Sequence, residues 1–451
     1  MRDVRLFRDP GLGNVSYLVD VGDDRAVLVD PDRRARRYLV AAREAGVELV
    51  GVLDTHLHAD FVSGSQEIRV ETGATLSVPA DAGVGYPHRP VEPGQRFEVG
   101  DAEVEVLSTP GHSPEHVSYV VRRGDAAPLL FSGGSLVVGG AARTDLAGPA
   151  LAERLTRDAF RTLHSAFDDL PDETRLLPTH GAGSFCSTGS RGRHTSTLGE
   201  ERATNPLLAV DEQRFVSEWP ASFPRIPAYF ARMREINWAG PRLRADLEMP
   251  RPLAPKAFAD AASKPGSIVI DTRSPDAYAE AHGEGALAIP FRDAFPTWLG
   301  WLVPEDARLL LILGEATLDD VVDACLLVGF ERFDGYLEGG IGAWQAAGLP
   351  VRSLPSIGAE DTVPWLKMGA QPLDVREPDE FERERISGAV PVPLGDLPQR
   401  TGALPAERPL IVYCASGMRS TTAASILERA GVGPVVNLRG GYGAWREAGR
   451  D

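Results

Sequence analysis

Cysteines and long apolar runs are scarce in this sequence of 451 residues. It has only 3 cysteines, Cys186, Cys325 and Cys414, which are too few and too widely spaced for a disulfide framework. No apolar stretch approaches the roughly 20 residues that span a bilayer, and residues 1–9 lack the apolar segment of a secretory signal. These absences predict a cytoplasmic location and no membrane partner.

Positive charge is also in short supply. Lys and Arg number 47 against 64 Asp and Glu, so the formal net charge is −17. A surface of this sign repels a phosphate backbone, and we therefore expect no nucleic acid partner. The remaining composition, 43% hydrophobic and 25% charged, is that of a globular protein, and at about 150 residues per domain the length predicts about three domains.

The first section of the chain, residues 1–240, alternates short apolar runs with Gly, Asp and Pro turns, as expected for strands interspersed with helices. Prolines and charged residues then concentrate in residues 241–254. Because proline interrupts both helices and sheets, this stretch is predicted to be a linker between domains.

The rest of the chain contains an internal repeat. The segment LEGGIGAWQAAG at residues 337–348 matches LRGGYGAWREAG at residues 438–449. A period of roughly 100 residues is too long for a solenoid unit. It predicts two domains of the same fold, residues 255–352 and 357–451, each an α/β domain with a parallel sheet.

A cysteine-containing loop is the most informative segment of the last domain. An apolar strand ends at Cys414, and a helix is predicted from Thr421. Backbone N–H groups and a helix N-terminus both favour an anion, so we expect a nucleophilic thiolate at Cys414. The loop residues predicted to cradle its anionic product are Ala415, Ser416, Gly417, Met418 and Arg419.

Residues 357–451 resemble the rhodanese family. The resemblance rests on the Cys414 loop and on three other segments, LDVREPDEF at 373–381, ISGAVPVP at 386–393 and GGYGAW at 440–445, although Arg385 replaces a usual histidine. It implies sulfur transfer through a persulfide on Cys414 without a cofactor. Thiosulfate, sulfite or a low-molecular-weight thiol persulfide would be the partners. A phosphatase is disfavoured, because its loop has five residues between Cys and Arg and this loop has the four residues 415–418.

The middle domain lacks this chemistry. Aligned without gaps, Gly314 corresponds to Cys414 and Asp319 to Arg419. The nucleophile is absent, and a carboxylate would repel a persulfide anion. Residues 255–352 are therefore predicted to be an inactive rhodanese-like domain.

Histidines follow several predicted strands of the first section. His56, His58 and Asp60 lie in the segment DTHLHAD, and His112 and His180 follow two later strands. Imidazole nitrogens and a carboxylate brought to one point form the kind of ligand set that zinc or iron uses.

Residues 1–240 resemble the metallo-β-lactamase superfamily, particularly its persulfide dioxygenase branch fused to rhodanese domains. The segments THLHAD, STPGHS and PTHGAGSFC carry the resemblance. It implies an αββα sandwich, and Fe(2+) held by His56, His112 and an aspartate, with His58, Asp60 and His180 as possible support. Two positions depart from the family: Gly134 replaces the aspartate, and Phe61 replaces a histidine. Gly134→Asp is therefore expected to rebuild the iron ligand set.

Three functions remain open. In the first, the first domain oxidises glutathione persulfide or a similar persulfide to sulfite, and Cys414 links the persulfide and thiosulfate pools. In the second, the chain is a sulfurtransferase whose degenerate first domain binds substrate or mediates assembly. The third is a metal-dependent thioester hydrolase. A homo-oligomer is compatible with each of them.

Overall fold

The computed structural model describes residues 4–188, 192–405 and 408–449. The chain divides into two compact units. The first runs to Leu247 and includes Asp323–Gly329, and the second comprises Glu248–Val322 and the rest of the chain from Phe330. Among the described residues, no helix combines the length and apolarity needed to cross a membrane.

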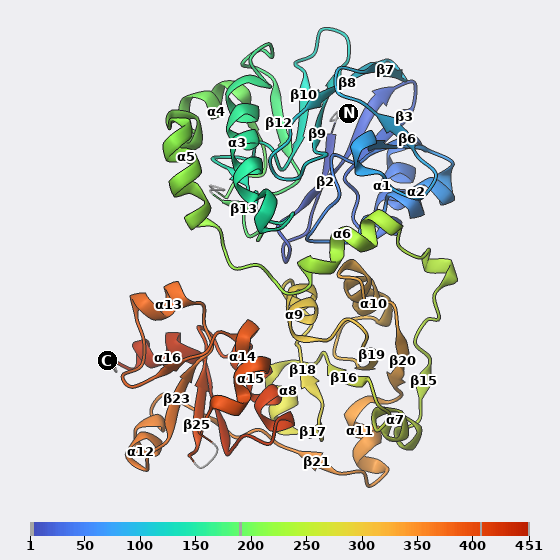
Figure 1. The fold of residues 1–451 in the computed structure, drawn as a ribbon. Helices are drawn as coiled ribbons and strands as arrows, with labels where there is room; N and C mark the ends of the chain where they lie inside the picture. Colours follow the sequence, from blue (N-terminus) through green and yellow to red (C-terminus); the bar gives the residue numbers. More distant parts are fainter. Residues whose placement is uncertain (1–3, 189–191, 406–407, 450–451) are drawn as a thin grey trace. The chain divides into compact units, whose positions relative to one another are not determined.

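The first unit contains two six-stranded sheets (Figure 1). The first sheet has its strands in chain order: β1 (Val4–Arg8), β2 (Val15–Gly22), β3 (Arg25–Val29), β4 (Glu48–Leu53), β5 (Thr75–Pro79) and β6 (Arg89–Val91). The second has the order β14 (Ser196–Thr197), β12 (Arg175–Pro178), β10 (Leu129–Gly133), β9 (Val117–Arg122), β8 (Ala102–Ser108) and β7 (Arg96–Val99). A small ribbon pairs β11 (Ala141–Ala142) with β13 (Ser187–Thr188).

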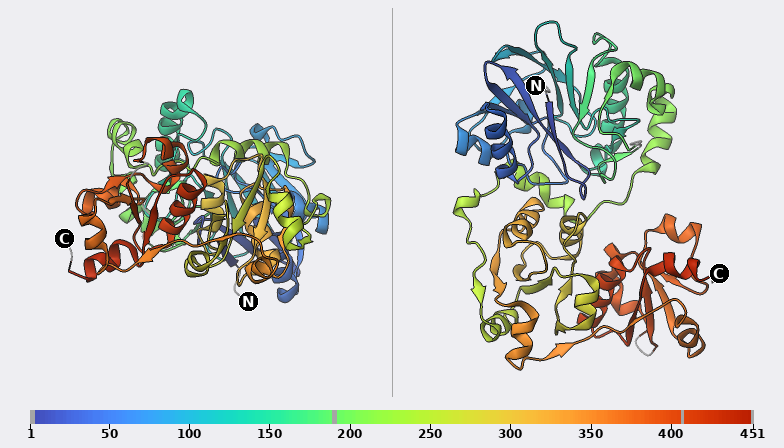
Figure 2. Two further views of the ribbon diagram at one scale, coloured as in Figure 1. Left: turned by 90° about the horizontal axis from the view of Figure 1, so that it is seen from below. Right: turned by 180° about the vertical axis from the view of Figure 1, so that it is seen from behind.

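The core of this unit lies between the two sheets because apolar side chains alternate along the strands. In β8, Val104 and Val106 are buried against Tyr17 and Val19 of β2 and Phe131 of β10. Helices cover the outer faces, α1 (Ala35–Ala45) and α2 (Ser65–Thr72) on the first sheet and α3 (Pro149–Ser165), α4 (Leu198–Thr204) and α5 (Glu212–Glu218) on the second (Figure 2). The predicted αββα sandwich is confirmed.

The second unit contains two five-stranded parallel sheets with the same strand order. The first sheet is β15 (Pro252–Leu253), β20 (Phe333–Leu337), β19 (Arg308–Ile312), β16 (Ser267–Asp271) and β18 (Leu287–Ala288). The second is β22 (Ser356–Ile357), β26 (Val435–Leu438), β25 (Leu410–Tyr413), β23 (Gln371–Asp374) and β24 (Val390–Pro391). This one-to-one correspondence confirms two rhodanese-like α/β folds. The stretch 241–254, predicted as a linker, supplies the edge strand β15 to the first of them.

Helices alternate with these strands. They are α7 (Pro255–Ala262), α8 (Pro275–Glu280), α9 (Phe295–Leu302), α10 (Leu318–Leu327), α11 (Gly340–Ala346), α12 (Thr362–Lys367), α13 (Pro378–Arg383), α14 (Leu397–Arg400), α15 (Met418–Arg429) and α16 (Gly441–Glu447), and α6 (Phe230–Ala239) precedes all of them. α6 and the C-terminal end of α10 belong to the first unit. There, the Val62 N–H donates to the Leu327 carbonyl at 2.9 Å.

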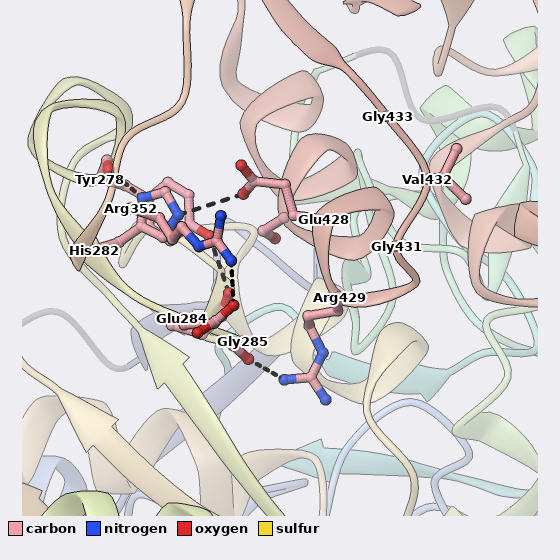
Figure 3. Close-up of a pocket in the computed structure, with 12 residues that line it drawn as sticks. Tyr278, His282, Glu284, Gly285, Arg352, Glu428, Arg429, Gly431, Val432 and Gly433 are labelled. Atoms are coloured by element: carbon pink, nitrogen blue, oxygen red, sulfur yellow. Dashed lines mark hydrogen bonds and ion pairs between the residues drawn. The ribbon is translucent and has the colours of Figure 1, made fainter. Parts of the chain in front are cut away.

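The two rhodanese-like halves of the second unit meet along α15 (Figure 3). The Ala288 N–H donates to the Ser425 hydroxyl at 3.0 Å, and His282 Nε2 lies 3.4 Å from the Glu428 carboxylate. The Arg429 guanidinium donates to the Gly285 carbonyl. A pocket of about 460 Å³ opens beside these contacts. Backbone groups of one half thus bond to side chains of the other, which ties the two folds together. β17 (His282–Gly283) and β21 (Val351–Arg352) form a ribbon at the same place.

Candidate functional site

The loop after β4 presents the first group of histidines. Buried Asp30 at the end of β3 fixes this loop by accepting hydrogen bonds from the Thr55 N–H at 2.8 Å and the Thr55 hydroxyl at 2.7 Å. The Thr179 hydroxyl also donates to Asp30, so the same carboxylate ties the loop that carries His180. Asp30 thereby holds together two loops far apart in sequence.

Five buried histidines converge at this point: His56, His58, His112, His116 and His180. The ring centroid of His56 lies 4.3 Å from that of His58, 4.8 Å from that of His112 and 5.4 Å from that of His180. The structure therefore brings together every histidine that the sequence assigned to the metal site.

Hydrogen bonds determine which nitrogen of two of these rings is available. The Thr55 hydroxyl gives its proton to Asp30, so at 2.8 Å it accepts from His56 Nδ1–H. His112 Nδ1–H likewise donates to the Arg143 carbonyl at 2.7 Å. In both rings Nε2 is therefore unprotonated and keeps its lone pair. Outer hydrogen bonds impose this arrangement on metal-binding histidines. Burial and neighbouring imidazoles hold the pKa of His56 and of His112 well below the usual range, so both rings are neutral.

Several buried polar atoms of the cluster lack hydrogen-bond partners among the described residues. They are both carboxylate oxygens of Asp60, both ring nitrogens of His58 and Nδ1 of His180. Two charged contacts without hydrogen-bond geometry remain, His58 Nε2 at 3.3 Å from Asp30 and His180 Nδ1 at 3.4 Å from Asp60. In addition, His180 Nε2 faces His56 Nε2 at only 3.3 Å. Buried polar groups without partners are costly. Ring nitrogens that face each other near a carboxylate without hydrogen bonds are well suited to a cation, and His56, His58 and His180 can offer ligand atoms within 4.8 Å of one another.

The two-histidine, one-aspartate iron site does not fit these residues. At Gly134, which replaces the aspartate, the backbone N–H donates to His116 Nε2 at 2.9 Å. His116 Nδ1–H donates to the Thr109 hydroxyl at 2.9 Å, so neither nitrogen of His116 remains for a metal. His116 therefore does not replace the missing carboxylate.

The close packing around Gly134 contradicts the expectation that Gly134→Asp rebuilds the site. A Cβ at residue 134 would lie 2.6 Å from Cδ2 of His112 and 2.9 Å from the Ala142 side chain. We expect Gly134→Asp to displace His112, to bring no stoichiometric iron and to lower stability by about 1–3 kcal/mol, the usual cost of overpacking. Iron analysis and urea unfolding check this. Stoichiometric iron in a folded Gly134→Asp protein would contradict it.

Phe61 also removes a ligand position. Its ring stacks on His58 with centroids 4.2 Å apart and an interplanar angle of 24°. The side chain is fully buried. An apolar ring therefore fills the place where the family carries a further histidine.

Sequence reasoning missed one candidate ligand, Cys186. The structure places its sulfur in a second group with His112 and His180, whose ligand atoms lie within 4.8 Å of one another. Burial, followed by the charge of Asp60, raises the pKa of the Cys186 thiol, so without a cation it stays protonated. The only sequence feature that could have indicated Cys186 as a ligand was its position six residues after His180.

The second candidate centre is the Cys414 loop. Cys414 follows β25 directly, and α15 begins four residues later at Met418. The Gly417 N–H donates to the Cys414 sulfur at 3.2 Å. Gly441 has a φ of +59° and approaches so closely that a Cβ there would lie 2.2 Å from the Cys414 carbonyl oxygen. The loop is therefore held by backbone contacts that only glycine permits.

Arg419 forms an ion pair that the sequence did not predict. Its guanidinium forms a two-point ion pair with Glu380 of α13, at 2.7 and 2.9 Å. Although burial opposes ionisation of Glu380, the hydrogen bonds from Arg419 outweigh it and lower the pKa of that carboxyl. Arg419 thus neutralises a carboxylate beside the loop, and its predicted contribution to the persulfide cradle stays a prediction.

This pairing makes Arg419→Ala testable in a double variant. Arg419→Ala should slow the reaction with thiosulfate by about tenfold or more, because the freed Glu380 carboxylate repels the dianion. Adding Glu380→Gln should recover part of the rate. Arg214→Ala, which breaks an exposed pair with Glu218 on α5, is the matched control and should have little effect. A double variant as slow as Arg419→Ala would show that Glu380 is irrelevant.

The corresponding loop of the middle fold is one residue longer than an ungapped alignment assumes. Asp271 pairs with Ile312 across its sheet as Asp374 pairs with Tyr413, so the strands align Leu313 with Cys414. The helix starts, at residues 318 and 418, instead align Gly314 with Cys414.

Neither residue that can correspond to Cys414 carries a nucleophile. Leu313 is aliphatic, and at Gly314 a Cβ would lie 3.1 Å from Cα of Arg273. Two carboxylates, Asp319 and Asp320, occupy the first turn of α10. The middle fold therefore has no thiol at this loop under either alignment.

Comparisons with known proteins assign both ends of the chain. Residues 9–186 match the metallo-beta-lactamase superfamily model, and residues 364–448 match the rhodanese-like domain model. The hydroxyacylglutathione hydrolase of Methylobacterium nodulans is 32% identical over 222 residues, which are 45% of this chain and 85% of that protein. The mitochondrial persulfide dioxygenase ETHE1 of Bos taurus is 29% identical over 215 residues, which are 47% of this chain and 78% of that protein. A crystal structure of a metallo-beta-lactamase from Staphylococcus aureus subsp. aureus COL has 29% identity and a TM-score of 0.65, covering 74% of this chain and 98% of that one.

Proposed function

The chain belongs to the metallo-β-lactamase superfamily and carries a C-terminal rhodanese-like domain, and from this we propose that it is a sulfurtransferase acting through a persulfide on Cys414. We assign the activity to residues 357–451, with 1–240 as the metallo-β-lactamase-fold domain and 255–352 as an inactive rhodanese-like domain. The observation that carries the proposal is the Cys414 sulfur at the start of a loop leading into α15, with the Gly417 N–H donating to it.

The chemistry follows from that position. The Cys414 thiolate attacks the outer sulfur of thiosulfate, the S–S bond breaks, and sulfite leaves with the bonding electron pair. The resulting persulfide anion keeps the Gly417 N–H as a donor, and the N-terminal end of α15 favours its negative charge. A thiolate acceptor then attacks the outer sulfur, which returns Cys414 as a thiolate. The reaction needs no cofactor.

Trapping the persulfide tests this directly. Purified protein treated with thiosulfate should gain the mass of one sulfur atom on the peptide that contains Cys414, and cyanide should remove it. The peptide of buried Cys325 serves as the internal control. Sulfur on Cys325 and none on Cys414 would refute the assignment.

A second candidate function concerns the first unit. Its buried histidines and the unbonded Asp60 carboxylate support metal binding, and the two curated relatives are named for a glutathione derivative and for a persulfide. We propose metal-dependent chemistry on a thiol-derived small molecule. Iron-dependent oxidation of persulfide is the less favoured form, because Gly134 supplies no carboxylate.

Two assays separate the alternatives. Oxygen uptake with glutathione persulfide reports dioxygenase activity, and release of free thiol from an acylglutathione reports thioester hydrolysis. A metal-loaded protein that performs neither reaction would favour a first domain that binds substrate or mediates assembly. Oxygen uptake with one iron per chain would overturn the view that this site cannot hold iron.

A further inference from the structure

We propose that the first unit binds a zinc-type cation through His112, His180 and Cys186, a ligand set in which a thiolate supplies the negative charge that Gly134 does not. The three ligand atoms lie within 4.8 Å of one another, and all three residues are buried. Thiolate and imidazole ligands together suit zinc, whereas the implied iron site requires a carboxylate.

The backbone of Arg143 ties two of these ligands together. Its carbonyl accepts from His112 Nδ1–H at 2.7 Å, and its N–H donates to the Cys186 carbonyl at 2.7 Å. The Arg143 side chain is itself held by Asp145, through hydrogen bonds of 2.6 and 2.8 Å. A single anchored residue thus sets the separation of His112 and Cys186, as outer-sphere contacts do in metal sites.

Asp60 lies beside one ring nitrogen of His180. His180 Nδ1 lies 3.4 Å from a carboxylate oxygen of Asp60, and neither atom has a hydrogen-bond partner among the described residues. A carboxylate behind one ring nitrogen leaves the other nitrogen for a metal. Asp60 thereby adds negative charge beside the site, and it belongs to none of the potential ligand groups found among the described residues.

The competing group of His56, His58 and His180 is less suitable. His58 Nε2 lies 3.3 Å from Asp30, which draws it away from a shared cation. That group also offers three imidazole rings and no anionic ligand, whereas Cys186 releases its proton on binding and contributes an anionic sulfur. Three protein ligands leave one coordination position open, as in zinc sites that perform catalysis.

X-ray absorption on the zinc-loaded wild-type protein tests the ligand set without any substitution. The expected first shell has one sulfur at about 2.3 Å together with nitrogen neighbours. A shell containing only nitrogen and oxygen would overturn the proposal.

Cobalt(II) binding assigns the sulfur to a residue. A thiolate-to-cobalt charge-transfer band should appear in the wild type, in Cys325→Ser and in Cys414→Ser, but not in Cys186→Ser. Zinc affinity, measured against a chromophoric chelator, should fall by at least about 100-fold in Cys186→Ser. Circular dichroism checks that each variant is folded. A charge-transfer band that persists in Cys186→Ser would refute the role of this residue, and neither outcome depends on sulfur transfer at Cys414.

Discussion

Cys414→Ser should lower thiosulfate-dependent sulfur transfer by at least about 10³-fold, the scale expected when a covalent nucleophile is lost. A serine hydroxyl forms no persulfide and is barely ionised at neutral pH. The measurement is thiocyanate formation from thiosulfate and cyanide. Because Cys414 is buried, with 1% of its surface exposed, the near-isosteric serine should leave the fold intact.

The matched control is Cys325→Ser. Cys325 is also fully buried, lies on α10 and belongs to none of the potential ligand groups found among the described residues. Its variant should keep nearly the parental rate even if it loses some stability, since a hydroxyl is placed in an apolar site. Equal rates for the parent and Cys414→Ser would remove the basis for a sulfurtransferase.

Asp30→Ala should destabilise the first unit by about 3–5 kcal/mol, because a buried acceptor of several hydrogen bonds disappears. The Thr55 N–H, the Thr55 hydroxyl and the Thr179 hydroxyl would all lose their acceptor. The measurement is the midpoint of urea unfolding, monitored with a spectroscopic probe that lies in the first unit.

Two further variants serve as comparisons for Asp30→Ala. Asp30 has a φ of +46°, which asparagine tolerates better than alanine, so Asp30→Asn should be less destabilising than Asp30→Ala. Glu44→Ala removes an exposed ion pair with Arg5 and should change stability by less than about 1 kcal/mol. An Asp30→Ala midpoint equal to that of Glu44→Ala would show that Asp30 is not the residue that holds the histidine loops.

Local patterns in the sequence were enough to predict the main architecture. The duplicated GAW segments predicted two similar folds, and the strand that ends at Cys414 predicted its loop. Both signals are contained within short stretches of chain. The pairing of Arg419 with Glu380 spans 39 residues, and no local pattern marks it.

The metal cluster shows the same limit more strongly. The proximity of Cys186 to His112 depends on the β11–β13 ribbon, which pairs Ala142 with Ser187. The environment of Gly134 depends on His116 and Ala142, whose positions follow from packing. Sequence reasoning identified which residue types were present but not which atoms were already occupied by neighbours.

The C-terminal end of α10 gives the metal cluster a remote reporter. Val62, two residues after Asp60, donates its N–H to Leu327, and the Arg232 side chain donates to the Val328 carbonyl at 3.1 Å. A cation that orders the loop of Asp60 would also protect residues 323–329 against hydrogen exchange, and by reciprocity fraying of this segment would weaken cation binding. A fragment that ends at Leu247 lacks that segment, so it should exchange faster around Val62 and hold metal less tightly than the full chain.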